Sequence, residues 1–296
     1  MKDNTIYALG FFDGVHLGHA ALLAACRRLA DERGCKAGVV TFSNHPDELV
    51  FGKAPALINS LQDRDWLLKE KFHMDTVISL PFDEPMMTMP WQDFYGLLRR
   101  EYGAAGLVCG EDFRFGSRGE GSGEKLTEVC TADGIPCSVV SQLRLNGQVV
   151  SSTHIRALIE DGQMEEAVRF LGHPHVLTGR VVHGHQLGRT LGIPTANLLL
   201  PEGLVVPKFG VYACLAEVEG QKYPAVANIG TRPTVGGTGI TVEPWILDFE
   251  GDLYGKEIRL EFCKFLRPEQ KFPDLAALQR EIRKNAEETR AFFQSK

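Results

Sequence analysis

The chain has 296 residues, of which 24% are charged and 44% are hydrophobic, so it has an ordinary globular composition and the length of two domains. Its formal net charge is −6, from 32 Lys and Arg against 38 Asp and Glu, which argues against a protein that coats nucleic acid or a membrane surface. No apolar run reaches the ~18 residues of a membrane span, and the N-terminus enters a strand-like run without a signal-peptide pattern. The seven cysteines form no C-x-x-C pair, which favours reduced thiols and a cytoplasmic location and argues against zinc or a disulfide scaffold.

Short apolar runs alternate with helical segments in the first half of the chain. The expected strands are Thr5–Gly10, Ala37–Phe42, Thr76–Leu80, Leu107–Gly110 and Cys137–Ser141. The expected helices between them are His19–Arg33, which Gly34 ends, and Leu61–Phe72, Trp91–Tyr102 and Glu124–Ala132. This alternation predicts an α/β domain with a mainly parallel, Rossmann-like sheet, in which ligands bind at the carboxyl ends of the strands.

The pattern changes after an expected helix over Ile155–Leu171. Closely spaced strands with turn residues between them predict a small antiparallel β-barrel, with strands at Thr178–His183, Val211–Glu219, Tyr223–Ile229, Thr241–Phe249 and Ile258–Phe265. A C-terminal helix follows from Asp274, an expected N-cap, to Phe293. We therefore predict two domains, residues 1–174 and 175–296.

The clearest chemical motif follows the first expected strand and runs from Gly10 to His19. The N-terminus of a helix offers unpaired N–H groups and a partial positive charge, so it attracts phosphate. His16 and His19 stand three residues apart at this helix entry, where both can donate to one phosphate group. The alternative is a glycine turn with two solvent-exposed histidines. The segment is neither a P-loop nor a G-x-G-x-x-G fingerprint.

These residues resemble a known family. His16-Leu17-Gly18-His19 is similar to the H-x-G-H signature of nucleotidylyltransferases, and the longer run from Phe12 resembles the bacterial bifunctional riboflavin kinase/FAD synthetase family. Further stretches in the family's order carry the same resemblance, namely Thr41-Phe42-x-x-His45-Pro46, Gly110-Glu111-Asp112-Phe113-Arg114-Phe115-Gly116 and Ser151-Ser152-Thr153-x-Ile155-Arg156. The resemblance implies an adenylyltransferase domain at the N-terminus and a riboflavin kinase domain at the C-terminus.

The resemblance implies roles for individual residues of the first domain. It makes His16 and His19 catalytic, and it assigns ATP binding to Gly10, Phe12, Asp13, Gly14, Gly18, Ser152, Thr153 and Arg156. It assigns flavin binding to His45, Asp112, Phe113, Arg114, Phe115 and Arg118. Aromatic rings suit a flavin or adenine, and arginine suits phosphate. Two alternatives stay open: the aromatic side chains only anchor their loop in the core, and the hydroxyls of Ser152 and Thr153 only cap a helix.

A second motif, Gly188–Asn197, matches the family's G-R-x-x-G-x-P-T-A-N at every fixed position. The resemblance assigns ATP binding to Gly188, Arg189, Thr195 and Asn197, and magnesium binding to Thr195 and Asn197, whose oxygens are hard ligands. It makes Glu243 the base of the kinase and assigns flavin binding to Arg267 and Glu269. The alternatives are a turn without chemistry and a glutamate on a solvated strand face.

The implied protein is a cytoplasmic enzyme that phosphorylates riboflavin to FMN and then adenylylates FMN to FAD, with ATP as co-substrate and Mg²⁺ in both steps. No nucleic acid or membrane partner is expected, and the sequence does not give the oligomeric state. Pro244-Trp245 departs from the family pattern, and because proline lacks an N–H it could place Glu243 on an edge strand. The alternatives are an enzyme that keeps one of the two steps and a non-catalytic flavin-binding or regulatory protein.

Overall fold

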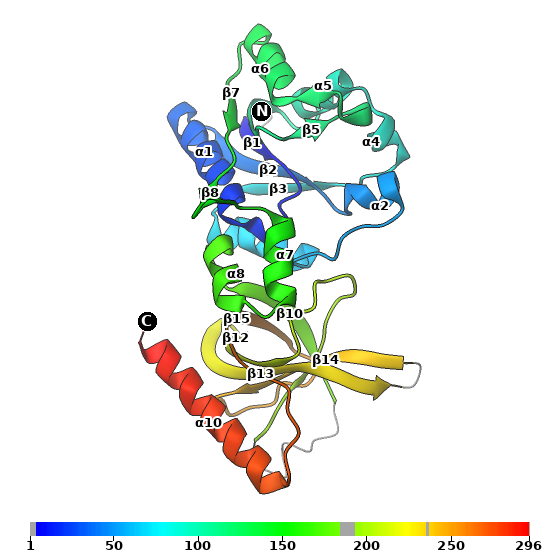
Figure 1. Ribbon diagram of the computed structural model, residues 1–296. Coiled ribbons are helices and arrows are strands. Elements are labelled where there is room, and N and C mark those ends of the chain that lie inside the picture. The colour runs from blue at the N-terminus through cyan, green and yellow to red at the C-terminus, as the bar shows by residue number, and fades with distance from the viewer. Residues whose placement is uncertain (1–3, 184–192, 235–236, 296) are drawn as a thin grey trace. The chain divides into compact units, whose positions relative to one another are not determined.

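The computed structural model describes residues 4–183, 193–234 and 237–295, and their contacts form two compact units (Figure 1). The first unit comprises Met1–Leu57 and Arg64–Ser152, and the second comprises Ile58–Asp63 and Thr153–Lys296. The helical residues after 152 therefore group with the barrel by their contacts, whereas the sequence places them in the first domain. In the described part of the chain, no helix combines the length and the apolar character that a bilayer crossing requires.

The first unit is built on a parallel sheet, as the sequence predicts. The strand order is β3-β2-β1-β4-β7, and each of the four pairings is parallel. The bounds of these strands are β1 Thr5–Leu9, β2 Lys36–Phe42, β3 Thr76–Leu80, β4 Ala104–Gly110 and β7 Cys137–Val140. Because the order reverses at β1, the carboxyl end of β1 is the switch point at which such sheets bind ligands.

Helices cover both faces of this sheet (Figure 1). On one face the Cys26 thiol of α1 lies against the carbonyl oxygens of Ile6 and Gly38. The other face carries Tyr7 and Leu9 into a core with α5 and α6. The helices of this part of the chain are α1 Leu17–Arg33, α2 Pro46–Phe51, α3 Leu61–Trp66 with a π-helical turn Leu67–Lys71, α4 Glu84–Thr88, α5 Trp91–Arg100 and α6 Gly123–Ala132. Gly34 ends α1 with a left-handed φ of 61°, as predicted.

The second unit contains a closed barrel with the order β10-β11-β14-β13-β12-β15, and this confirms the predicted antiparallel barrel. The strands are β10 His175–Val182, β11 Asn197–Leu199, β12 Gly210–Val218, β13 Gln221–Thr234, β14 Gly237–Ile246 and β15 Glu257–Pro268. The predicted C-terminal helix is α10, Leu275–Gln294, which lies along the outside of the barrel (Figure 1). Asp274 caps α10, because its carboxylate accepts the N–H of Ala277 at 2.7 Å.

Two expectations about local structure are wrong. The single helix expected over Ile155–Leu171 is two helices, α7 Ser152–Glu160 and α8 Met164–Leu171, because Gly162 takes a φ of 76° that ends the first. Pro244 does not make its strand an edge, since β14 lies between β11 and β13. The carbonyl of Pro244 still accepts the N–H of Ala196 at 2.9 Å, so the missing N–H does not separate these segments.

Candidate functional site

The first site is the turn between β1 and α1. Phe12 takes a left-handed φ of 60° and Gly14 a φ of 80°, and this reversal brings the chain into the helix at His16. His16 is the N-cap of α1, because its Nδ1 accepts the backbone N–H of His19 at 3.3 Å. A neutral imidazole that accepts at Nδ1 carries its proton on Nε2. In that tautomer Nε2 is the N–H donor of the His16 ring.

The two histidine rings lie stacked at this helix N-terminus, with centroids 3.7 Å apart and planes 11° from parallel. His16 is only 6% exposed, and burial together with His16 and Arg64 holds the pKa of His19 well below its usual value. The lowered pKa favours the neutral imidazole of His19 near pH 7, and a neutral imidazole carries one N–H donor. Gly18 packs closely here, because a Cβ would stand 3.1 Å from the His16 ring and the ring would have to shift. The alternative of two solvent-exposed histidines does not describe this geometry.

Six of the eight ATP-binding residues predicted for the first domain lie in this turn or against it. Asp13 is buried, and its carbonyl accepts the Ser152 hydroxyl at 2.9 Å, so Ser152 holds the turn. A Cβ at Gly10 would stand 3.1 Å from the ring of Phe12. Thr153 and Arg156 lie on α7 in the second unit, where Thr153 is exposed and Arg156 is half-buried.

A second loop follows β2 and reaches the same edge of the sheet. His45 is the N-cap of α2, with Nδ1 accepting the N–H of Asp47 at 3.1 Å. Its ring meets the ring of Phe11 edge-on at 4.6 Å, so the loop with His45 adjoins the turn that leads to His16. Asn44 fixes the loop to the end of β3, because its amide exchanges two hydrogen bonds of 2.9 Å with the backbone of Phe82.

The aromatic loop after β4 forms a small hairpin of β5, Arg114–Phe115, and β6, Gly121–Ser122. Phe115 is 7% exposed and packs in the core, which agrees with the alternative that it anchors the loop. Phe113 stacks on Phe115 at 5.5 Å and stays half-buried, whereas Asp112, Arg114 and Arg118 are exposed. Phe113 and the charged residues thus keep surface for a ligand.

The second site is a pocket of about 380 Å³ in the barrel unit. Its lining brings together four predicted site residues and their neighbours, namely Thr195, Val211, Val226, Asn228, Glu243, Trp245, Arg267, Glu269, Gln270, Phe272, Leu278, Ile282 and Asn285. Glu243 lies on β14 opposite Asn228 and is half-buried, and aromatic and aliphatic side chains line the same pocket. A carboxylate beside an apolar, ring-sized cavity suits a flat substrate that presents a hydroxyl group.

A neighbouring pocket of about 540 Å³ shares Thr195 with the first. It is lined by Val181, Pro194, Thr195, Ala196, Gly251, Asp252, Leu253 and Tyr254. The rings of His183 and Tyr254 stack at 3.9 Å. Asn197 begins β11 two residues after Thr195. Gly188 and Arg189 lie outside the described residues. Thr195 therefore borders both pockets.

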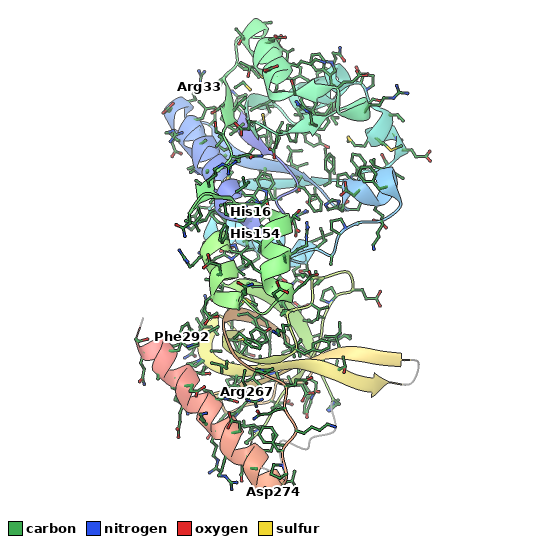
Figure 2. The ribbon with its side chains drawn as sticks, in the orientation of Figure 1. His16, Arg33, His154, Arg267, Asp274 and Phe292 are labelled. Atoms are coloured by element: carbon green, nitrogen blue, oxygen red, sulfur yellow. The ribbon has the colours of Figure 1, made fainter. Side chains whose placement is uncertain are left out.

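The C-terminal helix α10 lines the pocket and contacts Arg267, which Figure 2 labels. Arg267 Nε donates to Asn285 Oδ1 at 3.0 Å and lies 3.6 Å from Glu281, and the guanidinium stands over the Phe272 ring at 5.6 Å. Burial lowers the pKa of Arg267, and the carboxylates of Glu281 and Glu288 oppose that effect. In residues 4–183, 193–234 and 237–295, His, Cys, Asp and Glu form no cluster of three or more that could hold a metal ion.

Comparison with known proteins identifies both units. The FAD synthetase family model matches residues 1–154, and the riboflavin kinase family model matches residues 171–293. The chain belongs to the bifunctional riboflavin kinase/FMN adenylyltransferase family. Relatives with that name are 37% identical in Escherichia coli, over 99% of this chain and 94% of theirs, and 34% identical in Listeria monocytogenes, over 98% and 93%. A crystal structure titled macrolide-efflux protein, from Streptococcus pneumoniae, matches 98% of this chain and 95% of its own with a TM-score of 0.87 and 30% identity.

Sequence reasoning missed two buried polar residues of this family member. Arg64, only 2% exposed, donates to the carbonyl oxygens of Phe11 and Phe42, and Asn285, also 2% exposed, holds Arg267. Asn285 had a signal, since it continues the apolar stripe of Leu278 and Ile282 at helical spacing. Arg64 stands in a charged run, Gln62-Asp63-Arg64-Asp65, that resembles a solvated helix face and gave no signal.

Proposed function

We propose that this chain phosphorylates riboflavin to FMN in its barrel unit and transfers AMP from ATP to FMN in its sheet unit, giving FAD and pyrophosphate. The observation that carries the proposal is the grouping of Thr195 and Glu243 on one pocket while Thr195 also borders a second. The family and both of its domains are shown by the comparisons, and relatives that cover nearly the whole chain carry both activities in their names.

In the kinase step, the riboflavin 5′-hydroxyl attacks the γ-phosphorus of ATP, and the bond from that phosphorus to the β,γ-bridging oxygen breaks. A neutral alcohol is a poor nucleophile, so a carboxylate within hydrogen-bond reach accelerates the attack. We assign that task to Glu243, which takes the hydroxyl proton. Arg267 and Glu269 orient the flavin in the same pocket, and ADP leaves toward the pocket shared by Thr195.

In the adenylyl step, an FMN phosphate oxygen attacks the α-phosphorus of ATP, and pyrophosphate leaves. The nucleophile is already an anion at neutral pH, with a second pKa of about 6 by analogy with phosphorylated side chains, so no strong base is required. His16 and His19 donate N–H groups to the phosphate oxygens on which charge develops, and the N-terminus of α1 adds its partial positive charge. Phe113, Arg114 and His45 are proposed to hold the flavin and its phosphate, and Arg156 to bind ATP.

Magnesium fits the donor set of the kinase site, because Thr195 offers a hydroxyl oxygen and Asn197 an amide oxygen, both hard ligands. When bound there, Mg²⁺ supplies neutralisation of the charge on the transferring phosphoryl group. Thr195 lines both pockets, and Asn197 follows it by two residues at the start of β11.

The division into an adenylyltransferase domain of residues 1–174 and a kinase domain of residues 175–296 stays a prediction about the functional modules. A cytoplasmic location is proposed with it. Its support is the scattered spacing of the seven cysteines in the sequence, which is typical of thiols in a reducing compartment.

The two steps are tested by supplying each flavin separately. Purified protein is incubated with Mg-ATP and either riboflavin or FMN, and the products are separated by chromatography with fluorescence detection. We expect FMN and then FAD from riboflavin, and FAD from FMN. FAD from FMN but no product from riboflavin would reduce the proposal to the adenylyl step, and no product from either flavin would leave a binding protein.

A further inference from the structure

Arg64 is a buried cation below the loops of the adenylyltransferase site. It lies on α3, is 2% exposed, and has its guanidinium carbon 5.1 Å from the centroid of the Phe11 ring. Burial lowers the pKa of Arg64, while the carboxylates of Asp65 and Asp13 oppose that effect. An arginine keeps its charge even when it is buried, so burying the Arg64 guanidinium lowers the stability of the fold. A cost of this kind points to a function of Arg64 that offsets it.

The two hydrogen bonds of Arg64 join two loops. Nη1 donates to the carbonyl of Phe11 at 3.0 Å, and Nη2 donates to the carbonyl of Phe42 at 2.8 Å. Phe11 leads into the turn with His16, and Phe42 ends β2 just before His45. Thr41 adds a third bond, from its hydroxyl to the same Phe11 carbonyl at 2.9 Å. The planar fork of one guanidinium thus fixes the spacing of the ends of β1 and β2.

We infer that Arg64 is a positioning residue for adenylyl transfer, which holds the loop of His16 and His19 in register with the loop of His45 so that ATP and FMN meet correctly. This inference rests on the proposed function of the sheet unit. Two ring contacts link these backbone segments to the histidines. The ring of Phe11 meets the ring of His45 edge-on at 4.6 Å, and the ring of Phe12 lies 5.0 Å from the ring of His19. The spacing that Arg64 sets for the backbone therefore also sets the positions of these two histidine side chains.

The test separates positioning from a merely structural role. In Arg64→Met, each loop keeps its own binding groups but their spacing is released, so kcat for FAD formation should fall about 10²-fold, as expected for a misplacement of about 1 Å. KM for ATP and for FMN should each change less than about threefold. The kinase activity of the same molecules is an internal control and should stay unchanged.

Arg64→Lys keeps the charge but not the rigid fork, so kcat should recover to within about tenfold of the unsubstituted protein. Arg27→Met is the matched control. Arg27 also donates to a backbone carbonyl, that of His73, and pairs with Asp75 at 3.0 Å, and both activities should survive its loss.

A measurement independent of turnover uses ¹⁵N-labelled histidine and NMR. The groups that shift the titration of His19 are His16 and Arg64, with Asp13 beside Arg64. Loss of the cation should raise the pKa of His19 in Arg64→Met but not in Arg64→Lys, and the His45 signals should move with it.

Unchanged histidine spectra with FAD formation within threefold of normal would overturn the inference. So would loss of both activities and of the fold in Met and Lys variants alike, which would make Arg64 a general structural cation. If the unsubstituted protein makes no FAD from FMN, the proposed function fails, and the NMR result still decides the positioning.

Discussion

The two candidate sites both serve phosphate transfer involving a flavin, but they are built from different kinds of side chain. The site on the sheet unit is made of donors at a helix N-terminus, with His16 buried, His19 neutral and a buried arginine behind the loops. The site on the barrel unit is a largely apolar pocket with two carboxylates, Glu243 and Glu269, and one hydroxyl, Thr195, shared with a second pocket.

The difference follows from the nucleophile of each step. FMN is already an anion, so the sheet unit has only to stabilise charge, and neutral N–H donors serve that purpose. The riboflavin hydroxyl is neutral, so the barrel unit must remove a proton, and a half-buried carboxylate serves that purpose. Substitutions in one unit should therefore change one activity and spare the other.

Replacement of Glu243 should cause the largest loss of riboflavin kinase activity. Glu243→Gln keeps the size of the side chain but removes the base, so the rate of FMN formation should fall about 10³-fold, within the range for general base catalysis. FAD formation from supplied FMN should be unchanged. Equal rates of FMN formation in the variant and the unsubstituted protein would remove Glu243 from the mechanism.

Replacement of either His16 or His19 should lower the rate of FAD formation by the sheet unit. His19→Ala should lower the rate of FAD formation by about 10²–10³-fold, like the loss of an oxyanion donor, and should spare FMN formation. His16→Ala should do the same and also lose the N-cap, at a cost of about 1 kcal/mol of unfolding free energy. His16→Asn is the matched control, because it restores the cap without the Nε2 donor. Recovery of activity in His16→Asn would show that His16 acts only as a cap.

Replacement of Asn285 tests whether this residue positions Arg267 in the barrel pocket. Asn285→Leu removes the acceptor of a hydrogen bond from the charged Arg267 Nε, so unfolding free energy should fall by about 1–3 kcal/mol. The freed guanidinium should raise KM for riboflavin several-fold and leave FAD formation from FMN intact. Denaturant unfolding and initial rates of each step measure the two effects. An unchanged KM would show that Arg267 does not orient the flavin.

The smallest predicted effect is the contribution of His175 to the pH dependence of the unfolding free energy. His175 on β10 is fully buried, and burial, with His173 adding to it, lowers its pKa to about 3. The unfolded chain takes up this proton below about pH 6.5 while the folded chain does not, so stability falls as pH falls from about 6.5 toward 3. The slope from this one group is at most about 1.4 kcal/mol per pH unit. In His175→Leu, unfolding curves between pH 7 and 5 should lose that share of the slope, and an unaltered slope would contradict the assignment.

Patterns that are local in the sequence were predictable. The periods of the strands and of α1, the stop at Gly34 and the cap at Asp274 are set by neighbouring residues, and the structure agrees with them. The motif of His16 and His19 was visible because its strand, turn and helix are contiguous. The break at Gly162 was missed because the apolar residues on both sides of it are compatible with one helix.

Features that depend on distant residues were not predictable. The carbonyls that Arg64 binds lie 53 and 22 positions away along the chain, and no pattern around Arg64 indicates burial. The stacking of the His16 and His19 rings, and with it the neutral state of His19, follows from burial that a motif does not encode. The sequence also could not show that Pro244 lies inside a closed barrel, since closure depends on pairing β14 with the short strand β11.

The most direct test of two separate sites follows phosphorus from ATP into the flavins. Unsubstituted protein is incubated with riboflavin, Mg²⁺ and ATP labelled either at the γ- or at the α-phosphorus, and the labelled flavins are separated over time. The account predicts that γ-label enters FMN first and then FAD, and that α-label enters FAD alone. Appearance of α-label in FMN, or the absence of label from both flavins, would contradict it.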